Sequence, residues 1–557
     1  MADHVIHGNY VDFYDEKGPH KGILAWILTT DHKRIGLMYL IALTTFFCIG
    51  ATIGVLMRLE MLGQGRTIMG PQTYNSLFTL HGLIMIFLFV IPGIPAVFGN
   101  FFLPIMLGAK DVAFPRLNLL SWWLYITGGV FAVLSLFIAG GPIDTGWTFY
   151  VPYSLRTGTD VSWMILAAFI LGFSSILTGL NFITTIHRMR APGMGWFKMP
   201  LFAWSLYATA WIQLIATPIV GITLALVAIE RIFGVGLFDP TLGGDPILYQ
   251  HMFWIYSHPA VYIMILPAMG VASEIIPTFA HRTIFGYKAV AISSLAIAFV
   301  GYFVWGHHMF SSGMSDTSRW IFSLFTFLVA IPSAVKVFNW TATLYKGSID
   351  LKAPLLFVLA FIFVFSIGGL TGLVLGALAT DIHLTDTYFV VAHFHFVVFG
   401  GTGFIFFAAL HYWFPKMFGK LYNDNVAKVA IGMITLGFLM LYFTFFILGY
   451  EGMPRRYYDY LPQYHGLHVF ATVGSWVMIS GFIVMFVNLF KAFKSGKRAG
   501  MNPWGGMTLE WTIPSPPPLE NFEEIPVITH GPYDFHAQEE AKEKQEEFNH
   551  SAEDEIE

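Results

Sequence analysis

Six histidines lie within long apolar stretches of this sequence, and imidazole is the commonest transition-metal ligand in proteins. Two of them, His393 and His395, are two positions apart. On a helix that turns about 100° per residue, this spacing corresponds to about 200°, so the two rings point to opposite sides. One metal cannot bind both rings. We therefore expect the helix to serve two different centres, one on each side.

A second set of histidines has a spacing that favours one shared metal ion. His307 and His308 are adjacent, near the outer end of an expected helix, and about 100° apart. His258 and Tyr262 are four residues apart and share a helix face, while Pro259 loosens the preceding turn. Three neutral imidazoles suit copper, iron or zinc. A hydrogen bond to a neighbouring helix explains one such histidine, but it does not explain six with these spacings.

The composition indicates that these side chains are positioned by helices in a membrane. Of 557 residues, 56% are hydrophobic and only 11% are charged, and the mean hydropathy is +0.64. Such a chain cannot cover its apolar surface in water. The net charge of −4 also offers no basic surface for nucleic acid. These numbers exclude a soluble enzyme, a nucleic-acid-binding protein and a secreted scaffold.

Apolar runs of about 20 residues recur along the chain, and in lipid such runs must be helical because the backbone has no other hydrogen-bond partners. We predict an all-α integral membrane protein with a bundle of twelve transmembrane helices. The expected spans are 36–57, 75–102, 117–140, 160–182, 201–229, 250–276, 287–310, 318–338, 354–376, 386–411, 427–449 and 467–493.

The distribution of Lys and Arg in the connections predicts the orientation. Eighteen lie in connections on one side and seven on the other, and the seven are Arg58, Arg66, Arg156, Arg231, Arg319, Arg455 and Arg456. Positive charge favours the inner side, so we expect both termini in the cytoplasm.

Three segments follow from this pattern. Residues 1–30 form a polar segment without the features of a signal peptide, and residues 31–500 hold the twelve helices. Residues 501–557 begin as a Pro-rich arm and end in an acidic tail of the kind that stays disordered. The one cysteine, Cys48, lies in an apolar run and can form neither a disulfide nor a thiolate metal site with another cysteine of this chain.

The motifs around the histidines resemble those of subunit I of the haem-copper oxygen reductases, specifically the A-type cytochrome c oxidases, over about residues 25–520. The matching strings are TLHGLIMIF at His81, GDPILYQHMFWIYSHPAVY through His258 and Tyr262, WGHHMF at His307 and His308, IPSAVKVF at Lys336, DTYFVVAHFHF at His393 and His395, and GMPRRY at Arg455 and Arg456.

The resemblance implies a terminal respiratory oxidase that reduces O2 to water and pumps protons. It implies a low-spin haem a between His81 and His395, a high-spin haem a3 on His393, and one copper ion on His258, His307 and His308. Tyr262 would be covalently joined to His258 and donate an electron and a proton. Further haem contacts would come from Arg58, which meets the haem a formyl group, from Arg455 and Arg456, which hold propionates, and from Trp147 and Tyr388.

The resemblance also implies two proton paths from the inner face. Lys336, with Ser333 one turn earlier, would lead to Tyr262. Asp111 would be the entrance of the second path, whose lower part comprises Asn100, Asn118, Asn181, Ser174 and Ser175.

At the top of the second path the sequence departs from the commonest pattern. Many family members have Glu two residues after the copper-binding histidine, and this chain has Ala260. It has instead Tyr256 and Ser257 directly before His258. This is similar to a subgroup that replaces the glutamate with tyrosine and serine, so we expect these two hydroxyls to accept protons from Asp111.

Partners follow from the same resemblance. A dinuclear copper centre needs two cysteines, so it would sit on a subunit II, beside a subunit III and a cytochrome c donor. The implied location is the inner membrane of a bacterium. Asp386 matches a magnesium ligand, and we expect it near Glu510 on the outer side, but the histidine that usually precedes it is Thr385 and the nearest histidine is His383.

Three alternatives remain open on the sequence alone. A quinol oxidase differs mainly in its partner subunit. A nitric oxide reductase of the same superfamily also uses six histidines, although Tyr262 and Lys336 argue against it. A twelve-span secondary transporter belongs to a different class and does not explain the helical phases of the histidines.

Overall fold

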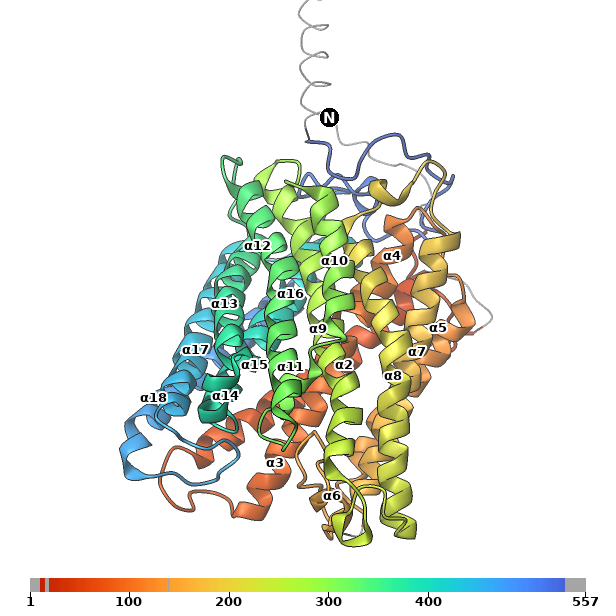
Figure 1. The fold of residues 1–557 in the computed structure, drawn as a ribbon. Helices are drawn as coiled ribbons and strands as arrows, with labels where there is room; N and C mark the ends of the chain where they lie inside the picture. Colours follow the sequence, from red (N-terminus) through yellow and green to blue (C-terminus); the bar gives the residue numbers. More distant parts are fainter. Residues whose placement is uncertain (1–10, 16–19, 139, 536–557) are drawn as a thin grey trace, which may run out of the picture.

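The structure is a computed structural model that describes residues 11–15, 20–138 and 140–535. Within these residues, twelve helical segments are long and apolar enough to cross a membrane, and they run side by side in one bundle (Figure 1). The predicted twelve-helix, all-α architecture is confirmed. The acidic tail from residue 536 onward and residues 1–10 lie outside the described part of the chain.

Seven of the twelve segments are single unbroken α-helices. They are α2 (His32–Glu60), α5 (Pro115–Leu134), α7 (Val161–Arg188), α8 (Leu201–Phe233), α9 (Pro246–Ala280), α13 (Ala353–Gly376) and α17 (Asp424–Tyr450).

The other five segments change their helical type or direction on the way. They comprise α3 (Pro71–Leu83), η1 (Ile84–Val90), η2 (Gly93–Gly99) and α4 (Asn100–Met106); α10 (Tyr287–Gly301) and η5 (Trp305–Met309); α11 (Asp316–Leu328) and α12 (Ala330–Leu344); α15 (Tyr388–Phe394), η6 (His395–Gly403) and α16 (Phe404–Phe418); and η7 (Pro462–Tyr464) and α18 (His465–Ser495).

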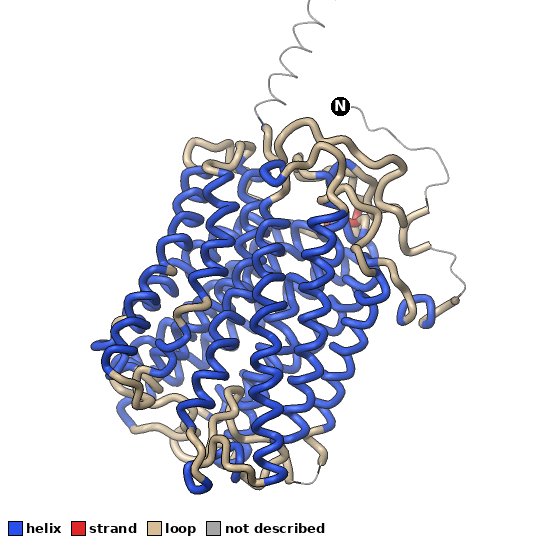
Figure 2. The backbone as a smooth tube through the Cα atoms, turned by 45° about the vertical axis from the view of Figure 1, so that its right-hand side comes forward, coloured by secondary structure: helices blue, strands red, loops and turns tan. Residues whose placement is uncertain are grey.

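Short elements connect these segments. They are α1 (Leu24–Ile27), α6 (Tyr153–Arg156), η3 (Trp196–Lys198), η4 (Pro240–Leu242), α14 (Leu378–Leu384), η8 (Leu509–Thr512), and the antiparallel pair of β1 (Lys420–Leu421) and β2 (Lys497–Arg498). Figure 2 shows that the loops gather at the two ends of the bundle.

The helix bounds differ from the apolar runs because a helix does not have to end where the lipid ends. The third segment stops at Leu134, short of the expected residue 140, whereas the fourth continues to Arg188. Helix starts follow ordinary capping: the Asp31 carboxylate accepts from the backbone N–H groups of Lys33 and Arg34 at the start of α2.

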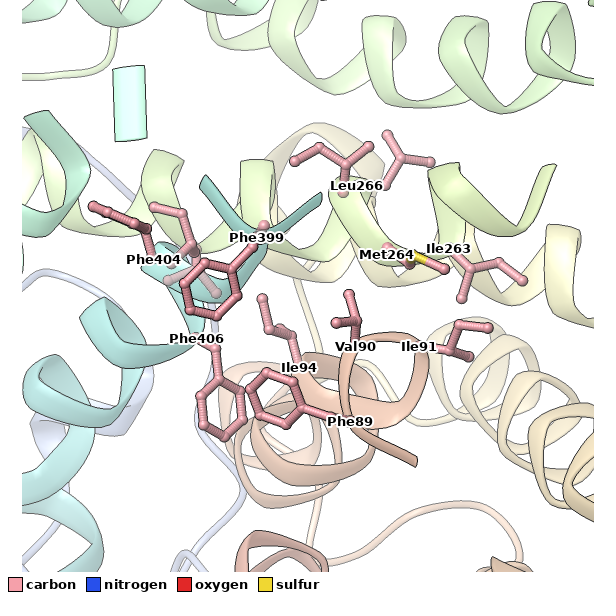
Figure 3. Close-up of a cluster of buried hydrophobic side chains, with 14 of the residues drawn as sticks. Phe89, Val90, Ile91, Ile94, Ile263, Met264, Leu266, Phe399, Phe404 and Phe406 are labelled. Carbon is pink, nitrogen blue, oxygen red and sulfur yellow. The ribbon is translucent and has the colours of Figure 1, made fainter. Parts of the chain in front are cut away.

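Helix α9 lies in the centre of the bundle and is almost completely buried. Its residues Ile263, Met264 and Leu266 face aromatic and branched side chains from two other segments (Figure 3). Those side chains are Phe89, Val90, Ile91, Ile94, Phe399, Phe404 and Phe406. Because a helix buried on all sides cannot tilt or rotate without breaking such contacts, α9 is a rigid support for the polar residues that it carries.

Residues 501–535 pack across one end of the bundle, which we call the arm end (Figure 1). There Lys33 donates to the carbonyl of Leu519 and to the side chain of Asn521, and Trp511 and Asn521 are buried. The expected Pro-rich arm is therefore folded onto the helices as far as residue 535. We call the opposite end, where α3 and α15 begin, the far end.

Candidate metal centres and proton paths

Three histidines meet in the far half of the bundle. In the described part of the chain, one group of three or more His, Cys, Asp or Glu side chains has ligand atoms that all lie within 4.8 Å of one another, and it consists of His258, His307 and His308. His258 comes from α9, and the other two come from η5. Three imidazoles that converge without a carboxylate form a neutral nitrogen donor set, which fits copper.

The sequence placed His307 and His308 on an α-helix, and this expectation is wrong. Helix α10 ends at Gly301, and the two histidines lie in the short 3₁₀ helix η5. A 3₁₀ helix turns more per residue than an α-helix, so consecutive side chains diverge further. The rings still lie close together, with centroids 4.2 Å apart, and η5 packs against α9, which carries His258.

Tyr262 lies one turn after His258 on α9, and its hydroxyl is 2.8 Å from His258 Nε2. The other ring nitrogen, His258 Nδ1, faces His308 at 3.1 Å. The phenol ring packs against Gly301, where an added Cβ would be 2.5 Å from two ring carbons. The glycine therefore leaves room for Tyr262 beside the trio, and His258 has one nitrogen toward the trio and one toward the phenol.

His81 and His395 face each other across a gap. Their ring centroids are 6.4 Å apart and the ring planes differ by 28°. Imidazole nitrogens bind metals at about 2.0–2.1 Å, so a gap of this size accommodates one metal ion between two rings. His395 also stacks on Tyr442 of α17, with centroids 4.2 Å apart, which fixes its ring plane.

His393 faces another helix. Its Nδ1 donates to the carbonyl of Gly368 at 3.0 Å and lies 3.2 Å from the Thr371 hydroxyl, both on α13. His395, by contrast, begins the π-helix η6, in which the backbone bonds from i to i+5. The two imidazoles therefore contact different neighbours, α13 on one side and α3 with α17 on the other.

Several of these histidines have one nitrogen held by an oxygen. His81 Nδ1 donates to the Gly50 carbonyl, His395 Nδ1 to the Val391 carbonyl, both at 2.8 Å, and His307 Nδ1 lies 3.0 Å from the Thr326 hydroxyl. A carbonyl accepts only, so the proton is on Nδ1 and Nε2 is left with its lone pair. Metal-binding histidines in proteins have this arrangement, and these residues fit haem iron and copper.

Arginines at the far end fit the anionic and polar edge of a haem. Arg58 is buried and donates to the His468 carbonyl and the Thr472 hydroxyl, but its Nε has no partner among the described residues. Arg456 lies over the ring of Phe78, and burial, with Arg455 next to it, lowers its pKa to about 10. Arg456 is beside a second cation and has the Asp386 carboxylate as one negative neighbour, and propionate carboxylates would supply further negative charge.

Trp147 and Tyr388 are also in this region. Trp147 packs against the helix that carries His81, where a Cβ on Gly82 would be 3.2 Å from its side chain. Tyr388 packs edge-on against His468, with centroids 5.7 Å apart. Trp147 is thus beside the helix of His81, and Tyr388 is beside the histidine whose carbonyl accepts from Arg58.

Asp386 and Glu510 do not lie together, contrary to expectation. Asp386 precedes α15 at the far end and accepts from Arg455 Nε at 2.8 Å. Glu510 is buried at the arm end, where Trp413 and Lys416 lie close to it. The segment between them, Tyr388–Phe418, has 31 residues, or about 46 Å of helix. A second far-end acid is Asp381, whose pKa burial raises to about 7, with Asp386 adding to the effect.

Lys336 is buried in α12 and turns to α10. Its ammonium group donates to the Val290 carbonyl at 3.0 Å and to the Ser294 hydroxyl at 2.8 Å. Ser333 is not its partner, because that hydroxyl donates to the Val329 carbonyl of its own helix. Gly301, which contacts the Tyr262 ring, is seven residues after Ser294 on α10. This separation is about 10 Å of helix, so α10 leads from the Lys336 ammonium group toward Tyr262.

Asp111, Asn118 and Asn181 gather at the arm end. The Asn181 side chain accepts from the N–H of Phe114 at 2.9 Å and donates to its carbonyl, which holds the loop after Asp111 against α7. Burial raises the pKa of Asp111 to about 7, and the Val112 N–H partly offsets this. A carboxyl group that changes charge near neutral pH can accept and release protons there.

Buried polar atoms continue toward the middle of the bundle. Ser174 donates to the Ser121 carbonyl at 2.7 Å. Several other atoms have no partner among the described residues, and they include Asn100 Oδ1, Asn118 Nδ2, Ser175 Oγ and Ser257 Oγ. Tyr256 is buried one turn before Ala260 on α9. Buried polar groups without protein partners are ordinarily bonded to water.

One contact at the histidine trio is not evident from the sequence, and it is made by Trp254. Its indole stacks on His308 with centroids 3.7 Å apart and planes 9° apart, and its Nε1 donates to Tyr150 at 2.6 Å. Trp254 and His308 are on different segments and 54 positions apart, so no local spacing indicates the contact.

Comparisons with known proteins identify the family of this chain. Residues 34–490 match the family model described as cytochrome C and quinol oxidase polypeptide I. Two similar proteins are named cytochrome c oxidase subunit 1. That of Thermostichus vulcanus is 45% identical over 91% of each chain, and that of Bacillus subtilis is 40% identical over 91% of this chain and 82% of its own.

A solved structure described as a heme-copper terminal oxidase dimer has a similar fold. Its TM-score is 0.66 at 22% identity, and the match covers 84% of this chain and 85% of that chain. The match to the family model and to these relatives confirms the resemblance to subunit I of the haem-copper oxidases and excludes the secondary-transporter alternative. The chain belongs to the family of polypeptide I subunits of cytochrome c and quinol oxidases, multi-pass membrane oxidoreductases that carry haem and copper.

Proposed function

We propose that this chain is the catalytic subunit of a proton-pumping cytochrome c oxidase that holds haem a, haem a3 and one copper ion. The observation that carries this proposal is the division of the histidines into a facing pair, His81 and His395, and a converging trio, His258, His307 and His308. His393 would bind the second haem beside the trio. When bound, the haems and the copper would pass the electrons of the donor to O2, which is reduced to water.

The residues around these groups hold them in place and move protons. Arg58, Arg455 and Arg456 would hold the polar edges of the haems, with Trp147 and Tyr388 nearby. Tyr262 supplies a proton through its hydroxyl, which lies 2.8 Å from His258. Its position between the trio and α10 supports covalent attachment to His258, as in the family.

Two routes bring protons from the arm end, which we propose faces the cytoplasm of a bacterium. Lys336 passes protons toward Tyr262 along α10, with Ser294 as its hydroxyl partner. Asp111 receives protons for the second route, which continues past Asn118 and Ser174 to Tyr256 and Ser257. This chain would thereby represent the subgroup that uses Tyr-Ser where other members use Glu.

Electrons would reach the chain from outside it. The one cysteine, Cys48, cannot build a dinuclear copper centre, so we assign that centre to a subunit II, with a subunit III and cytochrome c as further partners. Magnesium is not part of the proposal, because the Asp386 carboxylate is paired with Arg455.

A pyridine haemochrome spectrum with copper and iron quantification tests the proposal on the purified complex. We expect A-type haem and two irons for each copper bound to this subunit. Three irons without copper would identify a nitric oxide reductase instead. Oxidation of reduced cytochrome c, compared with oxidation of a quinol, identifies the donor.

A further inference from the structure

The second proton route has an unexplained step in the middle of the bundle. Ser174 and Ser175 are on α7, whereas Tyr256 and Ser257 are on α9. Helix α8 packs against both α7 and α9. Side chains of α8 are therefore placed to connect the two pairs, although neither the sequence motifs nor the family resemblance assigned any residue of α8 to the route.

Two polar residues of α8 have the required position. Gln213 and Thr217 are four residues apart, so they share one face of the helix. They are 3% and 1% exposed, respectively. Gln213 Oε1 and Thr217 Oγ1 have no hydrogen-bond partner among the described residues. A buried polar atom without a partner is destabilising, so water is the expected partner of both.

The packing of α7 places both residues beside the serines. An added Cβ on Gly179 would be 3.4 Å from Gln213 Oε1, and an added Cβ on Gly172 would be 3.3 Å from the Thr217 methyl group. Ser175 lies between these two glycines on α7. The α8 pair therefore spans the level of Ser175, with Thr217 nearer the far end.

The packing of α9 places Thr217 at the level of the copper-site histidine. Ser205 of α8 touches Gly270 of α9, since an added Cβ on Gly270 would be 2.0 Å from its hydroxyl. The two helices are antiparallel, and Thr217 is twelve residues after Ser205, just as His258 is twelve residues before Gly270. At 1.5 Å per residue the two positions lie at the same height. Ser257 is the neighbour of His258.

A small cavity joins the lower part of this step. It has a volume of about 30 Å³ and is lined by Tyr39, Ser174, Ser175, Thr178 and Gln213 together with apolar side chains. A cavity of about 10–15 Å³ is large enough to hold a water molecule, and a water molecule needs at least two polar partners. The cavity meets both conditions.

The Thr217 hydroxyl also differs from its neighbours on the same helix. Thr209 and Thr223 donate to the carbonyls of Ser205 and Ile219, four residues earlier, as buried threonines in helices ordinarily do. Thr217 makes no such bond. The hydroxyl is thus available to another acceptor.

We propose that Gln213 and Thr217 form the α8 step of the second proton route. The Gln213 amide positions a water in the cavity beside Ser175, and the Thr217 hydroxyl relays the proton toward Ser257. In the relay, the Thr217 oxygen accepts a proton from water on a lone pair and releases its own proton on the other side, so no net charge stays in the bundle. The step rests on the proposed function, since it has a role only if protons enter at Asp111.

The test uses the purified holoenzyme complex in lipid vesicles, with proton uptake followed by a pH dye after O2 is mixed with the fully reduced enzyme. Thr217→Val keeps the shape and removes the hydroxyl, and Gln213→Met keeps the length and removes the amide. We expect each to slow proton uptake by about tenfold or more, the order expected for a lost proton-transfer group. Thr217→Ser should restore the rate. Thr209→Val is the matched control and should leave it unchanged.

Asp111→Asn separates this inference from the proposed function. Slow uptake in Asp111→Asn together with normal uptake in Thr217→Val and Gln213→Met would overturn the α8 step and leave the route intact. Normal uptake in Asp111→Asn would overturn both. Haem spectra identify any variant that fails to assemble. If Thr217→Val does not assemble, proton uptake in Gln213→Met alone tests the α8 step. Slow uptake in Thr209→Val equal to that in Thr217→Val would show a packing effect and reject the relay.

Discussion

The indole of Trp254 lies flat against the imidazole of His308, with centroids 3.7 Å apart, while its Nε1 donates to the Tyr150 hydroxyl. The hydrogen bond fixes the indole, and the indole fixes the plane of the imidazole. The orientation of one ligand of the proposed copper site therefore depends on a residue that contacts no metal.

This relationship predicts that Trp254→Phe weakens copper binding, because phenylalanine cannot reach Tyr150 with a donor. Groups that orient metal ligands typically contribute about 10–100-fold in affinity. We expect copper to be lost to a chelator at correspondingly lower concentration, with both haems retained. Tyr150→Phe removes only the acceptor and should have a smaller effect in the same direction. Copper retention equal to wild type in both variants would contradict this role.

His393→Ala and His395→Ala should affect different haems. His393 faces α13, whereas His395 faces His81 across 6.4 Å. We expect His393→Ala to abolish O2 reduction but keep the low-spin haem spectrum, and His395→Ala to lose that spectrum. Optical spectra of the reduced proteins measure both. Equal loss of both haems from a folded protein would show that the ligands are not divided in this way.

Lys336→Met should slow the delivery of electrons and protons to the oxygen-reducing site. The ammonium group donates to the Val290 carbonyl and to the Ser294 hydroxyl, and methionine fills the same space without a proton. We expect reduction of the haem-copper site to become about a hundredfold slower. Stopped-flow reduction measures this rate. Ser333→Ala is the control, because its hydroxyl bonds to its own helix, and a large effect of that variant would place the route elsewhere.

Tyr256→Phe should reduce turnover and proton release. It removes the hydroxyl that we place where other family members have a glutamate, and it keeps the buried ring. Oxygen consumption and proton release in vesicles measure the effect. Because Tyr256 and Ala260 share a face of α9, Ala260→Glu in the Tyr256→Phe background should restore activity. Unchanged turnover and unchanged pumping in the single variant would remove Tyr256 from the route.

Docking of the C-terminal arm should weaken as pH rises from about 4.5 to about 7. Burial raises the pKa of Glu510 from about 4.5 to about 7, although Thr508, Trp413 and Lys416 lower it in part, and Glu274 lies near enough to interact with it electrostatically. Between these two pH values the unfolded arm has released the proton and the docked arm still holds it, so the docked state loses stability as pH rises. The loss is at most about 3 kcal/mol.

Glu510→Gln should remove this pH dependence, because glutamine keeps the shape and does not titrate. Limited proteolysis of the arm between pH 5 and pH 8.5 measures docking. We expect cleavage to increase with pH in the wild type and to stay constant in the variant. The same increase in both proteins would assign the pH dependence to another group.

The sequence by itself determined the twelve helices and the grouping of the histidines. Lipid permits only helices for apolar runs of this length, and the two-residue spacing of His393 and His395 makes their rings diverge on any helix. These properties are local, so no knowledge of packing is needed. The family motifs added the expected ligand sets.

Only the tertiary structure decided the contacts between segments. Whether Lys336 bonds to Ser333 or to Ser294 depends on how α12 lies against α10. Glu510 was expected beside Asp386, but the arm folds back over the opposite end of the bundle. His307 and His308 are held by a 3₁₀ helix, and Trp254 meets His308 because η5 packs against α9. Helix periodicity specifies which face a side chain occupies, but the partner on that face is set by close packing among all the helices at once.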